Sequence, residues 1–111
     1  MKKLKSIINA LEDLKIEDIL VFDMRDVNPF FDYFVLSTAS NNRQMQAAMR
    51  DIKQVLSTQD NVVNKKEGSD SGWALFDAGD IIVNIFTKEA REYYNLEKMW
   101  LDIPKLKLDE L

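Results

Sequence analysis

The stretch SGWALFDAGDIIVNIF, Ser71 to Phe86, predicts a β-hairpin, because two apolar runs rich in strand-forming residues flank the sequence Asp77-Ala78-Gly79-Asp80. Gly79 can take the positive φ that a tight turn needs. Two turns fit these residues: a three-residue loop over 77–79 with a bulge, or a two-residue loop at 78–79. The two turns differ by one position in pairing register, so they place different residues on the face that carries Trp73.

The two carboxylates of this stretch, Asp77 and Asp80, have two interpretations. Aspartate is favoured at turns because its side chain bonds to nearby backbone N–H groups. A catalytic carboxylate needs burial or a neighbouring like charge to shift its pKa, and the local sequence promises neither. We therefore interpret the pair as turn residues, with a metal site or an acid–base pair as the alternative.

Helical periodicity on the N-terminal side of the hairpin predicts a first helix, whose apolar stripe is formed by Leu4, Ile7, Ile8, Leu11 and Leu14. Residues 18–24 and 32–39 read as strands, and Asn28-Pro29 between them is a turn signal. Ser40 or Asn41 can cap a second helix, and Asn41 with Gln44 approximates a capping box. The buried stripe of that helix is expected at Met45, Ala48, Met49, Ile52, Val55 and Leu56.

A short strand is expected at residues 61–63, and Thr87 can cap a last helix that runs over residues 88–100. The order helix, two strands, helix, three strands, helix predicts an α/β (α+β) fold, a sheet of about five strands flanked by three helices. Residues 1–100 are expected to form one domain. Residues 101–111 are expected to be a loosely ordered tail, because Pro104 interrupts a segment of mixed charge.

Composition excludes several kinds of chemistry. The 111 residues include no cysteine and no histidine, which removes disulfides, thiolate–zinc sites and histidine-based catalysis. The formal charge is −4 and the basic residues are dispersed, which is not the pattern of a nucleic-acid-binding protein but suits a basic partner. The longest uncharged run is about ten residues, too short to span a bilayer. We therefore expect a cytoplasmic protein.

The segment REYYNLEKMW, Arg91 to Trp100, gathers the residue types that are enriched in protein interfaces. Adjacent helix positions lie about 100° apart, so Tyr93 and Tyr94 cannot both lie on one narrow buried stripe. At least one of these aromatic side chains is expected at the surface or in an oligomer contact.

Three runs of the chain resemble the ribosomal silencing factor family, also called Iojap: FDYFVLSTASNNRQ, GWALFDAGDIIVNIF and REYYNLEKMW. The resemblance covers about residues 3 to 100, with the motifs in the family's order. The matching positions are Asp32, Thr38-Ala39-Ser40, Arg43-Gln44, Trp73, Asp77 to Asp80, and Arg91 through Trp100.

The resemblance implies a role without catalysis, cofactor or metal. Members of this family bind the large ribosomal subunit through its protein number fourteen and block joining of the small subunit, which reduces translation when nutrients run short. They tend to form homodimers, and their mixed sheet resembles the nucleotidyltransferase fold. The partner-binding residues that the motifs suggest are Trp73, Asp77, Asp80, Asn84, Arg91, Tyr94, Glu97 and Trp100.

Asn84 is a departure from the family, many of whose members have a histidine at this position of the second hairpin strand. Asparagine keeps the hydrogen-bonding capacity but cannot become cationic. The alternative function is a metal-dependent nucleotidyltransferase, which would need clustered acids such as Asp-x-Asp on one strand. The chain contains no Asp-x-Asp.

Overall fold

The computed structural model describes residues 2–58 and 72–111. Its helices and strands, in chain order, are α1 (Lys2–Asp13), β1 (Glu17–Asp23), β2 (Tyr33–Ala39), α2 (Asn42–Thr58), β3 (Trp73–Asp77), β4 (Ile81–Thr87), α3 (Lys88–Tyr94), α4 (Leu96–Met99) and β5 (Lys105–Leu106), followed by a 3₁₀ turn at Leu108–Glu110. Within this part of the chain, no helix is both long enough and apolar enough to cross a membrane.

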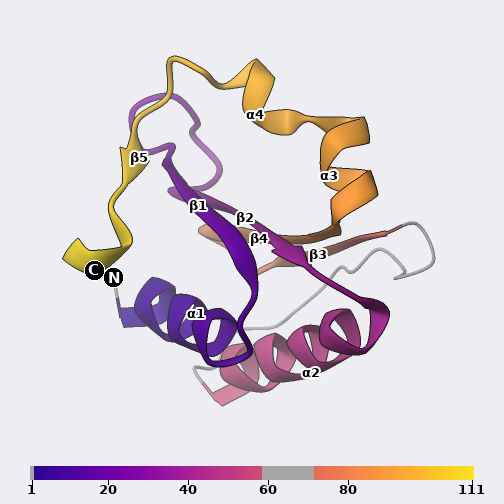
Figure 1. The fold of residues 1–111 in the computed structure, drawn as a ribbon. Coiled ribbons are helices and arrows are strands. Elements are labelled where there is room, and N and C mark those ends of the chain that lie inside the picture. Colours follow the sequence, from indigo (N-terminus) through magenta and orange to yellow (C-terminus); the bar gives the residue numbers. More distant parts are fainter. Residues whose placement is uncertain (1, 59–71) are drawn as a thin grey trace.

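The strands form one mixed sheet in the order β3-β4-β2-β1-β5. β2 and β4 are parallel, in a register that runs from Tyr33 opposite Ile81 to Ala39 opposite Thr87. The other three neighbouring pairs are antiparallel. Figure 1 shows α1 and α2 on one side of this sheet and α3 with α4 on the other. The prediction of a mixed, five-stranded α+β fold is confirmed, whereas its likeness to the nucleotidyltransferase fold stays a prediction.

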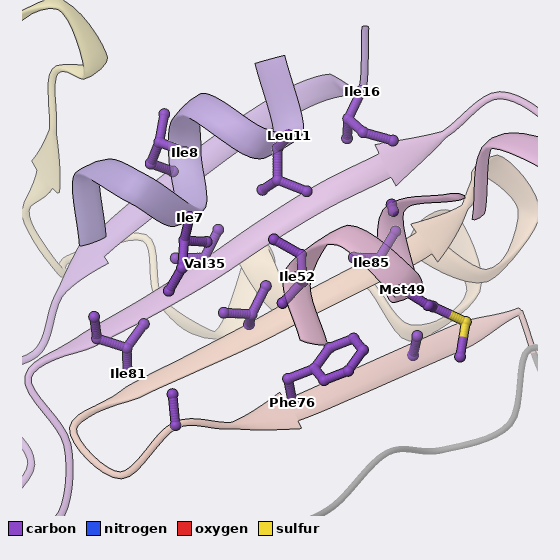
Figure 2. Packing of buried hydrophobic residues seen from close by; sticks show 14 of the residues in the cluster. Ile7, Ile8, Leu11, Ile16, Val35, Met49, Ile52, Phe76, Ile81 and Ile85 are labelled. Carbon is purple, nitrogen blue, oxygen red and sulfur yellow. The ribbon is translucent and has the colours of Figure 1, made fainter. Parts of the chain in front are cut away.

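The main core lies between the sheet and the helix pair α1–α2. Both apolar stripes predicted from the sequence face it, and Ile7, Leu11 and Ile52 pack there against Val35, Phe76 and Ile85 of the strands (Figure 2). Met45 and Met49 are buried core residues, as their helical spacing indicated. Each buried Leu, Ile or Met side chain contributes about 1.5–3 kcal/mol through loss of apolar surface from water. This face of the sheet therefore carries the larger of the two buried clusters.

Local capping sets the start of α2. The Asn41 side-chain oxygen accepts a hydrogen bond from Gln44 N at 2.8 Å, and the Gln44 side chain accepts one from Ser40 N at 2.6 Å. The same Gln44 amide donates to Leu14 O, in the turn after α1. The capping interaction predicted from the sequence is confirmed, and it also ties the second helix to the first.

The fifth strand differs from the prediction. The strand expected at residues 61–63 lies outside the described residues. In the described part, the fifth strand is Lys105–Leu106, which pairs with Val21 and Phe22 of β1. A further bond, from Asp23 N to Pro104 O at 2.8 Å, continues this contact. The division of the chain into a domain of residues 1–100 and a loosely ordered tail stays a prediction.

The last predicted helix is divided in two. Asn95 adopts the left-handed conformation, with φ 46° and ψ 51°, and its N–H bonds to Arg91 O, which ends α3. Asparagine tolerates this conformation better than most residues. The chain then turns back over the sheet through α4, so that Leu96 and Trp100 pack on the second face of the sheet.

The hairpin turn matches neither of the two predicted registers. Trp73 pairs with Phe86 and Asp77 with Ile82, and Ala78 N donates to Ile81 O, so the tip consists of Gly79 and Asp80. The physical reason is burial: Ala78 is buried in the main core, on the same side of the strand as Ala74 and Phe76. The alternation of buried side chains therefore continues to Ala78 and moves the turn towards the C-terminus.

Candidate partner-binding surface

The second face of the sheet carries an aromatic cluster. Phe22, Phe34 and Phe86 project from β1, β2 and β4, and α3, α4 and the following segment cover them. Trp100 packs edge-on against Phe34 and Phe22, with ring centroids 4.5 and 5.4 Å apart. Its two ring contacts hold the segment after α4 against the sheet. Trp100, one of the predicted binding residues, is thus partly an anchor of the fold.

Trp73 lies at the edge of this cluster and is half-buried. Its ring stacks on Phe86 with a centroid distance of 5.2 Å and an interplanar angle of 29°, and it contacts Tyr94 at 4.8 Å. Its Nε1 donates to Asn84 Oδ1 at 2.8 Å. The observed register brings Trp73, Asn84 and Tyr94 together, as predicted site residues, although their sequence separations gave no sign of it.

Asn84 itself is fully buried. Its Nδ2 donates to Val35 O at 3.1 Å, and its main-chain oxygen accepts from the Ser37 hydroxyl at 2.8 Å. A hydrogen bond therefore connects the buried Asn84 side chain to the partly exposed Trp73.

The acidic hairpin tip performs turn chemistry. The Asp77 carboxylate accepts a hydrogen bond from Gly79 N at 2.9 Å, and Gly79 has a φ of +87°. Asp80 is paired with Lys3 Nζ at 2.5 Å, and Lys3 also donates to Ala78 O. Asp77 lies on the same strand face as Trp73 and is half-buried, whereas Asp80 is engaged with α1. The two carboxylates therefore have different partners and do not act as a pair.

An ion pair between Arg91 on α3 and Glu97 on α4 links the two helices. The Arg91 Nε atom donates to Glu97 Oε1 at 2.7 Å, while its Nη1 donates to Thr38 Oγ1 at 2.8 Å and to the main-chain oxygen of Asp18. Asp18 sits at an irregularity in the pairing of β1 with β2 and has a φ of +50°. A cleft of about 430 Å³ opens beside these groups, lined by Asp18, Leu20, Thr38, Lys88, Arg91, Glu92 and Glu97.

Two exposed apolar residues near this surface, Met99 and Leu101, were not predicted from the sequence. Tyr93, Met99 and Leu101 are 82%, 72% and 73% exposed. Tyr93 fulfils the expectation that at least one tyrosine of the segment reaches the surface. Met99 and Leu101 are the chain neighbours of Trp100. Because Trp100 packs against the sheet, its two neighbours point away from it, and the sequence Met-Trp-Leu could have indicated that they are exposed.

Within the described ranges, no three His, Cys, Asp or Glu side chains lie close enough to hold a metal ion. The marked pKa shifts occur at the end of β1. The side chain of Arg25 donates to Asp23 and holds the pKa of that carboxyl below its usual value of 3.8, although burial opposes the shift. The same pairing raises the pKa of Arg25.

A family model described as "Ribosomal silencing factor during starvation" matches residues 1–111. The chain belongs to the ribosomal silencing factor family. It is 41% identical over 107 residues to the ribosomal silencing factor of Bacillus subtilis, a match that covers 96% of this chain and 91% of that protein. A more distant relative is the mouse protein "Mitochondrial assembly of ribosomal large subunit protein 1", 26% identical over 98 residues, which cover 85% of this chain and 43% of that protein.

A crystal structure of a protein from Bacillus halodurans has the same fold, with a TM-score of 0.82 at 32% identity, covering 96% of this chain and 97% of that one. The resemblance seen in the three sequence motifs is thus confirmed over the whole chain. Ribosomal silencing factors are a regulatory family and not an enzyme family. The family membership supports a silencing role.

Proposed function

We propose that this protein binds the large ribosomal subunit through its protein number fourteen and sterically prevents the small subunit from joining, which lowers translation when nutrients are scarce. The observation that carries the proposal is the match of the family model to the entire chain. The name of the mouse relative, which refers to the ribosomal large subunit, supports the choice of particle. A steric mechanism needs no transition state to be stabilised, so it requires no catalytic group.

The partner-binding surface in this proposal is the side of the aromatic cluster that α3 and α4 leave accessible. Trp73 and Tyr94 supply aromatic contact area, and Asp77 supplies a carboxylate on the same strand face as Trp73. Trp and Tyr are the residue types that most often dominate binding energy at interfaces. The Asp77 carboxylate, at the other end of the same strand face, would pair with Lys or Arg of a basic ribosomal protein and speed association.

The remaining predicted site residues are proposed to act by holding this surface. Arg91 and Glu97 join α3 to α4, and Trp100 packs on the sheet, so the three together place the segment that carries Tyr94. Asp80 is already paired with Lys3 and is proposed to contribute to the tip's shape.

Co-sedimentation with isolated large subunits over a series of salt concentrations tests the proposal. We expect binding that weakens as salt rises, together with reduced reassociation of large with small subunits. Asp77→Asn keeps an oxygen for the Gly79 bond but removes the charge, so it should weaken binding and flatten the salt dependence. Asp51→Asn, on α2 at the opposite face, is the matched control. Protein that leaves large subunits free to pair with small ones refutes the proposal.

The protein is further proposed to be cytoplasmic and to form a homodimer when it is not on the ribosome. The exposed apolar side chains of Tyr93, Met99 and Leu101 give a self-association surface a physical basis. Met99→Glu should shift the sedimentation of the isolated protein from dimer towards monomer. A wild-type chain that sediments as a monomer at micromolar concentration would refute this part of the proposal.

A further inference from the structure

The side chain of Asn84 links the candidate binding surface to the centre of the sheet. On one side its Oδ1 accepts the indole N–H of Trp73 at 2.8 Å, and on the other its Nδ2 donates to Val35 O at 3.1 Å. Asn84 is fully buried, whereas Trp73 is half-exposed. One amide group therefore connects a partly exposed ring on the edge strand of the described sheet to the Val35 carbonyl on β2.

The orientation of this amide follows from its partners. An indole N–H can only donate and a main-chain carbonyl can only accept. The group between them must therefore present an acceptor to Trp73 and a donor to Val35 at the same time. Both needs are met by the amide of Asn84, and within the described residues no buried side-chain nitrogen or oxygen lacks a partner.

The hydrogen bond does what the ring contacts cannot. Trp73 stacks on Phe86 and leans on Tyr94, and such contacts tolerate sliding and rotation of the ring in its own plane. A hydrogen bond is directional, and a bond to Nε1 selects which edge of the indole faces inward. The acceptor that makes this choice is fixed in turn, because Asn84 lies in the central part of β4 and is bonded to β2.

We propose that Asn84 is the positioning residue that fixes the Trp73 ring for partner binding. This role rests on the proposed function, in which Trp73 contacts the ribosomal partner. The three groups that bond to Asn84 outside the strand ladders are the Trp73 indole, the Val35 carbonyl and the Ser37 hydroxyl, and none of them titrates between about pH 5 and 8. The bonds that Asn84 makes are therefore expected to be independent of pH over this range.

Substitutions at position 84 separate this role from simple packing. In Asn84→His, a neutral imidazole can accept from Trp73 with one nitrogen and donate to Val35 O with the other, whereas an imidazolium has two donors and no acceptor. In Asn84→Asp, a carboxylate accepts from the indole but sets an oxygen against the Val35 carbonyl. Asn84→Leu keeps a similar branched shape and can make neither bond.

The Trp73 indole N–H itself reports the link. The chain has two tryptophans, so ¹⁵N-labelled protein gives two indole signals, and Trp73→Phe identifies the relevant one. We expect the Trp73 signal of the natural chain to keep its shift and slow exchange at about pH 5.5 and at about pH 7.5. Asn84→His should match it at the higher pH and lose it at the lower, and Asn84→Leu should lose it at both. Asn84→Asp should keep slow exchange at the higher pH, because its carboxylate still accepts the indole N–H, but should shift the Trp73 signal, because an oxygen then faces the Val35 carbonyl.

Large-subunit co-sedimentation of the same proteins completes the test. Asn84→Leu should bind at least about tenfold more weakly than the natural chain, and Asn84→His should lose affinity only at the lower pH. Circular dichroism of Asn84→His at both pH values shows whether the protein stays folded, so that loss of the ring's placement is distinguished from unfolding. A Trp73 signal unchanged in Asn84→Leu, or a displaced ring with unchanged affinity, overturns the proposal. A natural chain that binds no subunits, yet shows the expected indole signals, overturns the proposed function and leaves Asn84 as the residue that places the ring.

Discussion

Replacing Arg91 with methionine should destabilise the fold strongly, because three different segments share its guanidinium. The side chain is 11% exposed and bonds to Glu97, to the Thr38 hydroxyl and to the main-chain oxygen of Asp18. Arg91→Met keeps much of the aliphatic stem while removing all three bonds. It also leaves a buried hydroxyl and a carboxylate that must find other partners.

The magnitude follows from the individual bonds. The bond to Glu97 is charge-assisted but its partner is 34% exposed, so it contributes about 1.5 kcal/mol, at the low end for such bonds. The bonds to Thr38 and Asp18 contribute slightly less than about 1 kcal/mol each, because solvent can partly replace them. The sum is about 3 kcal/mol, which for a domain of this size lowers Tm by about 12 °C.

Urea unfolding followed by circular dichroism measures this difference. Arg50→Met is the matched control, because Arg50 is 74% exposed and lies 3.9 Å from Asp51, so it should change stability by less than about 0.5 kcal/mol. A double-mutant cycle with Glu97→Gln should give a coupling of about 1 kcal/mol. An Arg91→Met protein within about 0.5 kcal/mol of the natural chain would show that the guanidinium does not hold α3 and α4 to the sheet.

Three further results are expected. Arg25 keeps the pKa of Asp23 below 3.8 in the folded state, so its stabilising contribution is present above that pH and is lost as the pH falls through the folded pKa. The urea midpoint of Asp23→Asn should therefore lie below that of the natural chain at about pH 6, and the gap should narrow as the pH is lowered below 3.8. Gly79→Ala, whose added methyl would meet open space, should cost only the strain of positive φ, about 1 kcal/mol, whereas Gly72→Ala should cost at least about twice as much in the same assay, since its methyl would lie 2.7 Å from the hydroxyl oxygen that caps α3. Trp100→Ala should lower the free energy of unfolding by about 3 kcal/mol and Trp100→Phe by less than half of that, and equal losses would contradict the ring packing seen here.

Much of the fold could be read from neighbouring residues in the chain. The apolar stripes of α1 and α2, the Asn41–Gln44 cap and the cap of α3 by Thr87 are confirmed. These features depend on contacts within about four residues, where helical geometry alone decides which groups meet. The family resemblance depended on the same kind of local pattern, and it led to the correct family.

The sequence predicted which residues belong to the candidate surface but not how they are arranged. Trp73 and Tyr94 do lie together, but Asn84 is buried beneath them and Asp80 is paired with Lys3. The sequence could not reveal these positions, because each partner lies on a different element. Lys3 and Asp80, for example, are separated by 77 positions in the chain.

What the sequence by itself determined is the type of most segments up to α3, since periodicity, caps and turn residues act over one or two turns of chain. Gly79 and Asp77 were marked as turn residues by their own chemistry, and both serve the turn. Only the tertiary structure decided the register of the hairpin. Burial of Ala78 in a core built with distant helices outweighs the local turn preferences, and the tip therefore lies at Gly79 and Asp80. Likewise, the break at Asn95 separates α3 from α4, and Trp100 packs between Phe22 and Phe34 of the sheet. The stabilisation from this packing could not be predicted from any single stretch of the chain, because the site for Trp100 exists only once β1 and β2 have paired.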